Sequence, residues 1–226
     1  MKKIFALALA AMMVLSMAAC GEETPATTTT APVVSTPETT APVVTAPVVT
    51  DPIETEPEMS MPALVETDVE SLKIMNTIWA LYTDPETTPF VMGGSISEEG
   101  VVAGEGVPGV YDAAMLADLQ GILYIPEAEI ANIDEAATAM HAMMANNFTA
   151  GVVHATGDAA ALANTMTETL KNNQWICGQP ETLIVAVINA EYVLIGFGAG
   201  DIMEGFITNV TTAFADAQIV FNGSLI

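Results

Sequence analysis

Two apolar segments in the C-terminal part of the chain constrain its fold more than any other feature. Residues 183–188 read LIVAVI, and residues 192–197 read YVLIGF. The three residues that separate them, Asn189-Ala190-Glu191, suit the turn of a β-hairpin. Because both segments are apolar on both faces, we expect this hairpin to lie in the middle of a sheet.

The same order of elements is indicated twice. Residues 148–155 have strand character, and a Gly-Asp pair at residue 157 then opens a helix with an apolar stripe. The hairpin at 183–197 is followed in the same way by a Gly-Asp pair at residue 200 and a second striped helix. The sequence therefore predicts an α+β fold, an antiparallel sheet with helices packed on one face, and favours a duplicated strand–strand–helix unit.

The starts of two further elements can be placed from capping patterns. Thr67-Asp68-Val69-Glu70 is a capping box that predicts the first helix of the globular part, and Asp201 with Glu204 predicts a similar cap on the last one. Residues 90–110 are rich in glycine and acidic residues around one short apolar run, which indicates a strand and an exposed loop. Residues 113–119 suggest a short helix.

Residues 130–144 carry two conflicting signals. Their alanine and methionine content favours a helix. Asn146-Asn147, just before the strand at 148, instead suits a two-residue hairpin turn, because asparagine tolerates positive φ. Both alternatives stay open from the sequence, and we favour a strand from about Thr138.

The N-terminal segment has the layout of a secretory signal. A positive start precedes an apolar run at residues 4–17, and small residues follow before Cys20. Met17-Ala18-Ala19-Cys20 resembles the lipobox of bacterial lipoproteins, in which the cysteine is diacylated before cleavage. We therefore expect a lipoprotein signal peptide at 1–19 and a lipid attached to Cys20, which would hold the chain on the extracytoplasmic face of the membrane. An unlipidated secreted protein is the alternative.

The segment after the cysteine has the composition of a linker. The motif TAPVV occurs three times, and eight of the 13 prolines lie before residue 63. Such spacing favours extended, solvated polyproline geometry without internal hydrogen bonds. We therefore predict a lipidated, disordered Thr/Pro-rich linker at 20–62 and a single globular α+β domain at 63–226.

The charge of the chain excludes several classes of partner. Arginine is absent, and the chain beyond the signal carries two lysines against 28 acidic residues, a formal charge of −26. Nucleic acids require clustered Lys and Arg, so we expect no nucleic-acid partner. Anionic lipid is repelled too, so membrane attachment must come from the lipid on Cys20. No motif for a cofactor stands out, and we expect none.

Several motifs resemble one family. The lipobox, the Thr/Pro spacer, LYIP at 123–126, the AMHAMM stretch and QWICGQPETLIVAVINAEYVLIGFG are similar to an uncharacterised domain of lipoproteins from anaerobic Gram-positive bacteria. The likeness covers about residues 110–216. It implies a surface-tethered α+β domain of unknown function, and it transfers no catalytic residues.

The chain has two histidines, His141 and His154, that could serve in a metal site. If Asn146-Asn147 forms a two-residue turn, His141 faces Val152 and His154 is its diagonal neighbour on the same face, with Met143 nearby. Two imidazoles and a thioether suit copper(I). The same face could equally be hydrophobic core, with methionine as a filler of gaps.

These observations favour a non-enzymatic binding or cell-envelope interaction module, with a protein or cell-wall partner. A soft-metal (copper) or small-ligand binding protein is the alternative, and an extracytoplasmic hydrolase comes third, because no catalytic residues can be named. A binding module predicts an exposed apolar patch. A metal protein requires that His141, Met143 and His154 converge, and an enzyme requires a deep pocket with perturbed ionisable groups.

Overall fold

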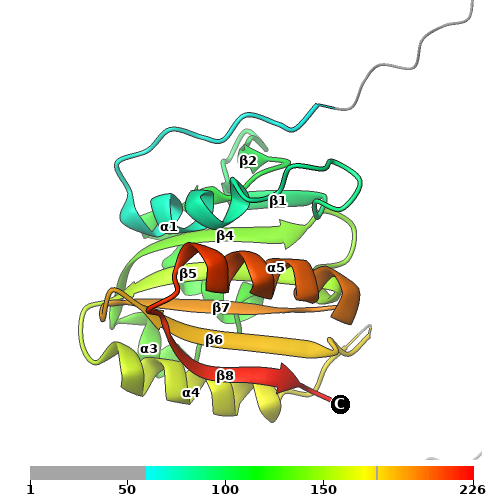
Figure 1. Cartoon of the computed structure of the whole chain (residues 1–226). Helices are drawn as coiled ribbons and strands as arrows, with labels where there is room; N and C mark the ends of the chain where they lie inside the picture. The colour runs from blue at the N-terminus through cyan, green and yellow to red at the C-terminus, as the bar shows by residue number, and fades with distance from the viewer. Residues whose placement is uncertain (1–59, 177) are drawn as a thin grey trace, which may run out of the picture. The chain divides into compact units, whose positions relative to one another are not determined.

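The described residues form one antiparallel sheet of eight strands, and its arrangement can be followed in Figure 1. The computed structural model describes residues 60–176 and 178–226. The order across the sheet is β2-β1-β4-β5-β7-β6-β8, and β3 pairs with β4 beside this path. The strands are β1 (Val91–Ile96), β2 (Val102–Glu105), β3 (Gly109–Tyr111), β4 (Ile133–His141), β5 (Phe148–Ala155), β6 (Thr182–Ile188), β7 (Tyr192–Gly198) and β8 (Gln218–Ser224). The predicted α+β class and antiparallel sheet are confirmed.

Helices cover both faces of this sheet. One face packs against α1 (Glu70–Trp79) and α5 (Gly200–Ala213), and the other against α4 (Ala159–Lys171) and the segment that follows β3. That segment contains the 3₁₀ helix η1 (Ala113–Asp118) and two short helices, α2 (Leu119–Ile122) and α3 (Glu127–Ile130). Aromatic side chains such as Trp79, Phe148 and Phe206 fill the α1/α5 layer, and all three are buried.

The strand–strand–helix unit does occur twice, as β4-β5-α4 and β6-β7-α5, but its helices lie on opposite faces rather than on one. The reason is topological. Helix α4 joins β5 to β6, which run parallel on either side of β7, and α5 joins β7 to β8, which run parallel on either side of β6. Both connections move across the sheet toward the β8 edge, but the strands from which they start, β5 and β7, run antiparallel to each other. The strong preference for right-handed crossovers therefore sends the two helices to opposite faces.

The central hairpin matches its prediction. Strands β6 and β7 lie inside the sheet, and every residue of each strand after the first is buried. Ile188 pairs with Tyr192, so three residues form the turn. Two of them, Asn189 and Ala190, have positive φ, which asparagine accepts more easily than alanine.

The ambiguous segment 130–144 contains strand β4, which begins at Ile133, earlier than predicted. Tertiary packing overrides its helical composition here. Ala136 contacts the α4 layer, whereas Ala137 and Ala139 contact the α1/α5 layer, and all three are fully buried. Small side chains allow both helix layers to approach the strand closely, so alanine serves packing rather than helix formation.

The glycine-rich region 90–110 is more regular than predicted, since it forms β1, β2 and β3 around one short exposed loop. Glycine is required where these strands approach each other. A Cβ atom on Gly93 would lie 2.3 Å from the backbone nitrogen of Gly109. Close backbone packing, rather than flexibility, explains the composition.

Neither of the two predicted capping motifs supplies the N-cap of its helix, although the Thr67 hydroxyl accepts the Val69 N–H at 3.0 Å. Helix α1 begins at Glu70 without a capping side chain from its own N-cap, and the Ser71 N–H instead donates to Glu135 Oε1 at 2.6 Å. Helix α5 begins at Gly200, whose N–H donates to the Glu181 carboxylate. Asp158 does cap α4, where it accepts from the Ala161 N–H. Both replacement caps come from strand neighbours that only the tertiary fold brings near.

The signal peptide, most of the linker and both cysteines, Cys20 and Cys177, lie outside the described residues. The described residues all belong to one compact unit. No helix within them is long and apolar enough to cross a bilayer.

Candidate functional site

The two histidines lie at opposite ends of the β4–β5 ladder. Thr149 pairs with Met140, and Val152 faces Ala137 instead of the predicted His141. His154 is paired with Glu135. The predicted register is wrong because residues 142–147 form a longer connection that includes a 3₁₀ turn, rather than a two-residue turn.

This register separates the proposed copper ligands. His141 lies six positions along β4 from Glu135, the residue paired with His154, or about 20 Å along a strand. Met143 is 82% exposed. The His141 Nδ1 accepts from the backbone N–H groups of Met143 and Met144, so this imidazole fixes the loop. The described residues contain no group of three or more His, Cys, Asp or Glu side chains placed to hold a metal ion. His141, Met143 and His154 therefore do not form one site.

His154 instead lines a groove of about 620 Å³ at the other end of the sheet. We call this hollow the acidic groove. Strands β4, β5 and β7 supply its floor, and the end of β3 and the start of α1 supply its walls. It is lined by Val69, Val110, Tyr111, Asp112, Ala113, Asp134, Glu135, His154 and Tyr192.

The imidazole in the acidic groove is held from two sides. His154 Nδ1 lies 2.6 Å from Asp134 Oδ1, and the His154 ring lies 5.0 Å from the Tyr192 ring between centroids. An ionised carboxylate only accepts hydrogen bonds, so Nδ1 carries the proton in this contact. The other ring nitrogen, Nε2, is then free to accept a hydrogen bond when the imidazole is neutral.

The local field in the groove is negative. The pKa of Tyr192 is raised, first by desolvation and then by the carboxylates of Glu135, Glu70, Glu191 and Asp134, which oppose a phenolate. Desolvation, followed by the charge of Asp118, also raises the pKa of Tyr111.

No lysine lines the groove to offset this charge. Lys73 pairs with Glu70, and Lys171 pairs with Glu168 on α4. The groove is therefore electrostatically suited to a positively charged group.

The lining residues limit the chemistry that this groove can support. It offers an imidazole, three carboxylates and two phenol rings, but none of its lining side chains is a serine, threonine or cysteine nucleophile. Carboxylates beside aromatic faces are a common means of holding an ammonium or guanidinium group. The groove thus fits cation binding better than nucleophilic catalysis.

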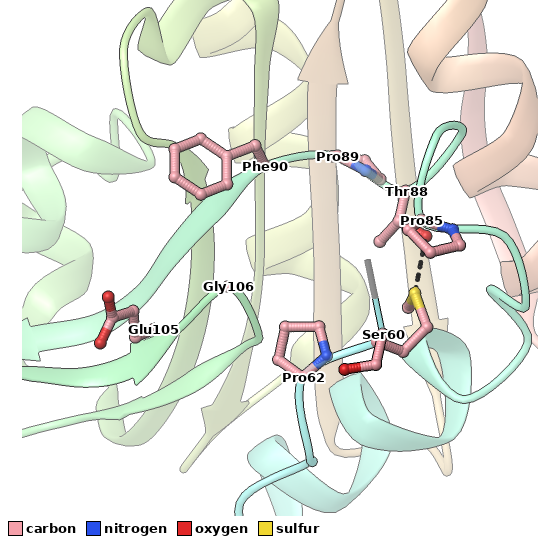
Figure 2. A pocket seen from close by; sticks show the side chains of 9 residues that line it. Ser60, Pro62, Pro85, Thr88, Pro89, Phe90, Glu105 and Gly106 are labelled. Atoms are coloured by element: carbon pink, nitrogen blue, oxygen red, sulfur yellow. Dashed lines mark hydrogen bonds between the residues drawn. The ribbon is translucent and has the colours of Figure 1, made fainter. Parts of the chain in front are cut away.

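A second hollow, of about 500 Å³, is apolar and lies where the chain enters the domain (Figure 2). Pro62 faces Pro89 and Phe90 across it, and Met61 and Pro85 also line it. The Thr88 hydroxyl donates to Met61 Sδ at 3.4 Å and ties the two walls together. Its lining has one ionisable side chain, that of Glu105, so it offers little chemistry beyond apolar contact.

A third and smaller hollow lies between the β4–β5 connection and the segment before β6. Met143, Met144 and Ile176 line it, and the side-chain amide of Asn146 donates to the carbonyls of Ile176 and Gly178. Met143 and Ile176 are 82% and 80% exposed. Met143, for which the sequence left open a metal-ligand role or a place in the core, is therefore at the surface.

Sequence reasoning identified His154 but not its neighbours. Asp134 and Glu135 are adjacent carboxylates at the start of a largely apolar strand, which was the available signal for a polar site at that end. Tyr192 and Tyr111 reach the groove from other strands, and only the sheet order brings them there.

No protein-family model matches the chain, and no curated protein or solved structure is significantly similar to it. The function must therefore be argued from the acidic groove itself.

Proposed function

We propose that this chain is a lipid-anchored, extracytoplasmic binding protein that holds cationic organic groups in the acidic groove. One observation carries the binding part of this proposal: carboxylates and aromatic rings line the same groove without a lysine among them. The anchoring part is supported by the resemblance of Met17-Ala18-Ala19-Cys20 to a lipobox. The ligand class comprises ammonium and guanidinium groups, free or carried on a larger molecule of the cell envelope.

The expected affinity for a minimal ligand is low. A cation over an aromatic face contributes about 0.5–2 kcal/mol, and each ion pair with an exposed carboxylate about 0.2–1 kcal/mol. Asp134 is 58% exposed in its side chain, so the lower values apply to it. One aromatic face and two ion pairs sum to about 1–4 kcal/mol, which corresponds to a dissociation constant of roughly 1–200 mM. A ligand with several such groups, or one presented on a surface, would bind more tightly through multivalency.

The two histidines provide an internal control for the test. Choline is titrated into protein labelled with ¹³C in its histidine rings, and 3,3-dimethylbutan-1-ol serves as its neutral isostere. His154 lies in the groove, whereas His141 lies at the far end of β4. We expect choline to shift the His154 resonances in a saturable way while the His141 resonances stay unchanged. The neutral alcohol should leave both unchanged.

Two substitutions assign the binding energy to the groove. Glu135→Gln removes one charge but keeps an acceptor for the Ser71 N–H, and Tyr192→Leu removes the aromatic face. Each should weaken choline binding about threefold to tenfold, the equivalent of roughly 1 kcal/mol. Glu204→Gln on α5 makes the same charge change outside the groove lining and should bind choline like the wild type. Equal shifts with the neutral alcohol, or an equal loss in Glu204→Gln, would contradict the proposal.

The anchor is tested separately. Cells that express the chain are fed an alkyne-bearing fatty acid, and labelled protein is detected after coupling to a dye. We expect the wild-type chain to be labelled and to sediment with membranes, and Cys20→Ala to lose both properties. Labelling that persists in Cys20→Ala would refute this attachment site without affecting the groove.

A further inference from the structure

His154 has two neighbours that a bound cation would also use. Its Nδ1 lies 2.6 Å from Asp134 Oδ1, and its ring centroid lies 5.0 Å from that of Tyr192. Residues that pair directly across strands share a face of the sheet, and His154 pairs with Glu135 on one side and with Tyr192 on the other. The imidazole therefore lies between carboxylates and an aromatic ring, where the proposed ligand would bind.

Asp134 reaches His154 through an irregularity in β4. Successive residues of a strand point to opposite faces, so Asp134 and Glu135 would not ordinarily share one. The β4–β5 pairing shifts its register between Ile133 and Glu135, and Asp134 lies at this shift. Such irregularities re-aim side chains, often next to functional sites. The backbone of β4 thus turns the Asp134 carboxylate toward His154.

The charge of His154 determines what the groove offers to a cation. When the ring is neutral, Nε2 can accept a hydrogen bond. When the ring is protonated, Nε2 becomes a donor and the imidazolium forms an ion pair with Asp134. The imidazolium then also lies within the roughly 6 Å over which an aromatic ring attracts a cation, here the ring of Tyr192. Protonated His154 therefore uses the same carboxylate and the same ring as the ligand, and acts as an internal competitor.

The other ionisable groups around His154 are carboxylates and phenols, with one lysine paired to a carboxylate. They are Asp134 and Glu135 of β4, Glu191 and Tyr192 at the start of β7, Glu70 of α1 with its partner Lys73, and Tyr111 and Asp112 at the end of β3. Carboxylates and phenols ordinarily titrate near pH about 4 and about 10, whereas histidine ordinarily does so between pH about 5 and 8. The pKa values of Tyr111 and Tyr192 are raised, which keeps both phenols further from the histidine range. A change of charge in the groove within that range is therefore expected at His154.

We infer that His154 makes cation binding in the acidic groove depend on pH: the neutral imidazole admits a cationic group, and the protonated imidazole displaces it. This inference rests on the proposed function, because it requires a cation that binds in the groove. By linkage, the bound cation and the second proton on His154 weaken each other by the same factor. Two like charges about 5 Å apart in a largely aqueous site repel enough to weaken binding about threefold to tenfold.

Choline is the probe, titrated into the full chain in a neutral maltoside detergent at pH 8 and at pH 5.5, with the ionic strength held constant. The tyrosine rings are labelled with ¹³C. Tyr192 reports on the groove, and Tyr124, which packs against Trp175 in the other helix layer, is the reference. We expect the dissociation constant from the Tyr192 shifts to be about threefold to tenfold higher at pH 5.5, while choline leaves the Tyr124 resonances unchanged at either pH.

Two matched variants assign this pH dependence to one histidine. His154→Gln has no group at this position that gains a proton in the range, so its dissociation constants at the two pH values should be equal. His141→Gln makes the same change at the far end of β4 and should keep the ratio of the wild type. Wild-type Tyr124 resonances in each variant show that its fold is retained.

The outcomes separate this inference from the proposed function. Choline binding in the wild type that is equally tight at both pH values would overturn the inference and leave cation binding intact. A pH dependence that persists in His154→Gln, or that is lost equally in His141→Gln, would do the same. No binding of choline at pH 8 would overturn the proposed function, and this inference with it.

Discussion

Replacing Glu135 by alanine should destabilise the domain through a helix that is far away in sequence. Glu135 lies on β4, and its carboxylate accepts the Ser71 N–H at 2.6 Å across 64 positions of the chain. Ser71 lies in the first turn of α1 and is fully buried, so water cannot replace the lost acceptor easily. The N-cap residue Val69 supplies no side-chain acceptor of its own.

The expected cost follows from two contributions. Loss of a capping acceptor costs about 1 kcal/mol, and loss of a negative charge at a helix N-terminus costs about 0.3–1 kcal/mol. Glu135→Ala should therefore lower the free energy of unfolding by roughly 1–2 kcal/mol. Glu135→Gln retains an acceptor and should cost only the charge contribution, about 0.3–1 kcal/mol.

Urea denaturation followed by tryptophan fluorescence measures these differences, because Trp79 lies at the end of α1 and is buried. In thermal unfolding the alanine variant should melt about 2–8 °C below the wild type for a domain of this size. Glu204→Ala, the same change on an exposed helix position, is the matched control and should be nearly neutral. A Glu135→Ala variant within about 0.3 kcal/mol of the wild type would refute the reasoning, as would equal losses from Gln and Ala.

Further outcomes are expected for Tyr82 and for two glycines. Tyr82→Phe should stabilise the domain by about 1 kcal/mol in urea denaturation, because the Tyr82 hydroxyl is buried without a hydrogen-bond partner among the described residues. Burial raises the pKa of Tyr82, so the unfolded chain loses this proton at a lower pH than the folded domain does. The free energy of unfolding should therefore be unaffected by Tyr82 below pH about 10 and fall as the pH rises further. Tyr82→Phe should reduce that fall. Gly198→Ala should cost about 1–3 kcal/mol, since its Cβ would lie 2.3 Å from the Asn147 carbonyl oxygen. Gly205→Ala should instead raise the free energy of unfolding by about 0.5–1 kcal/mol, because a Cβ atom at this position of α5 meets no close neighbour. The melting temperatures of the two glycine variants measure both effects.

Elements whose determinants are local were predictable from the sequence. The β6–β7 hairpin and its turn follow from continuous apolar runs, and the start of α4 follows from the Gly-Asp pair at residue 157, where Asp158 is the N-cap. The repeated strand–strand–helix order was visible for the same reason. Its placement on two faces was not, because the side that a helix takes depends on the direction of its strand within the finished sheet.

Properties that depend on register or on distant contacts could not be predicted. The spacing of Asn146-Asn147 suggested a two-residue turn, whereas the longer connection leaves His141 and His154 far apart. A shift in register moves a residue along its partner strand without changing the sequence pattern on either strand. The acidic groove depends on the same information, because Asp134 and Tyr192 meet His154 only through the strand order β4-β5-β7.

A crystal structure of the chain with choline, at a concentration that saturates the His154 shift, tests cation binding most directly. Our account predicts that the trimethylammonium group lies in the acidic groove, within about 6 Å of the Tyr192 ring and facing the Asp134 carboxylate. Choline bound elsewhere, with the groove between Tyr192 and His154 holding none, would contradict it.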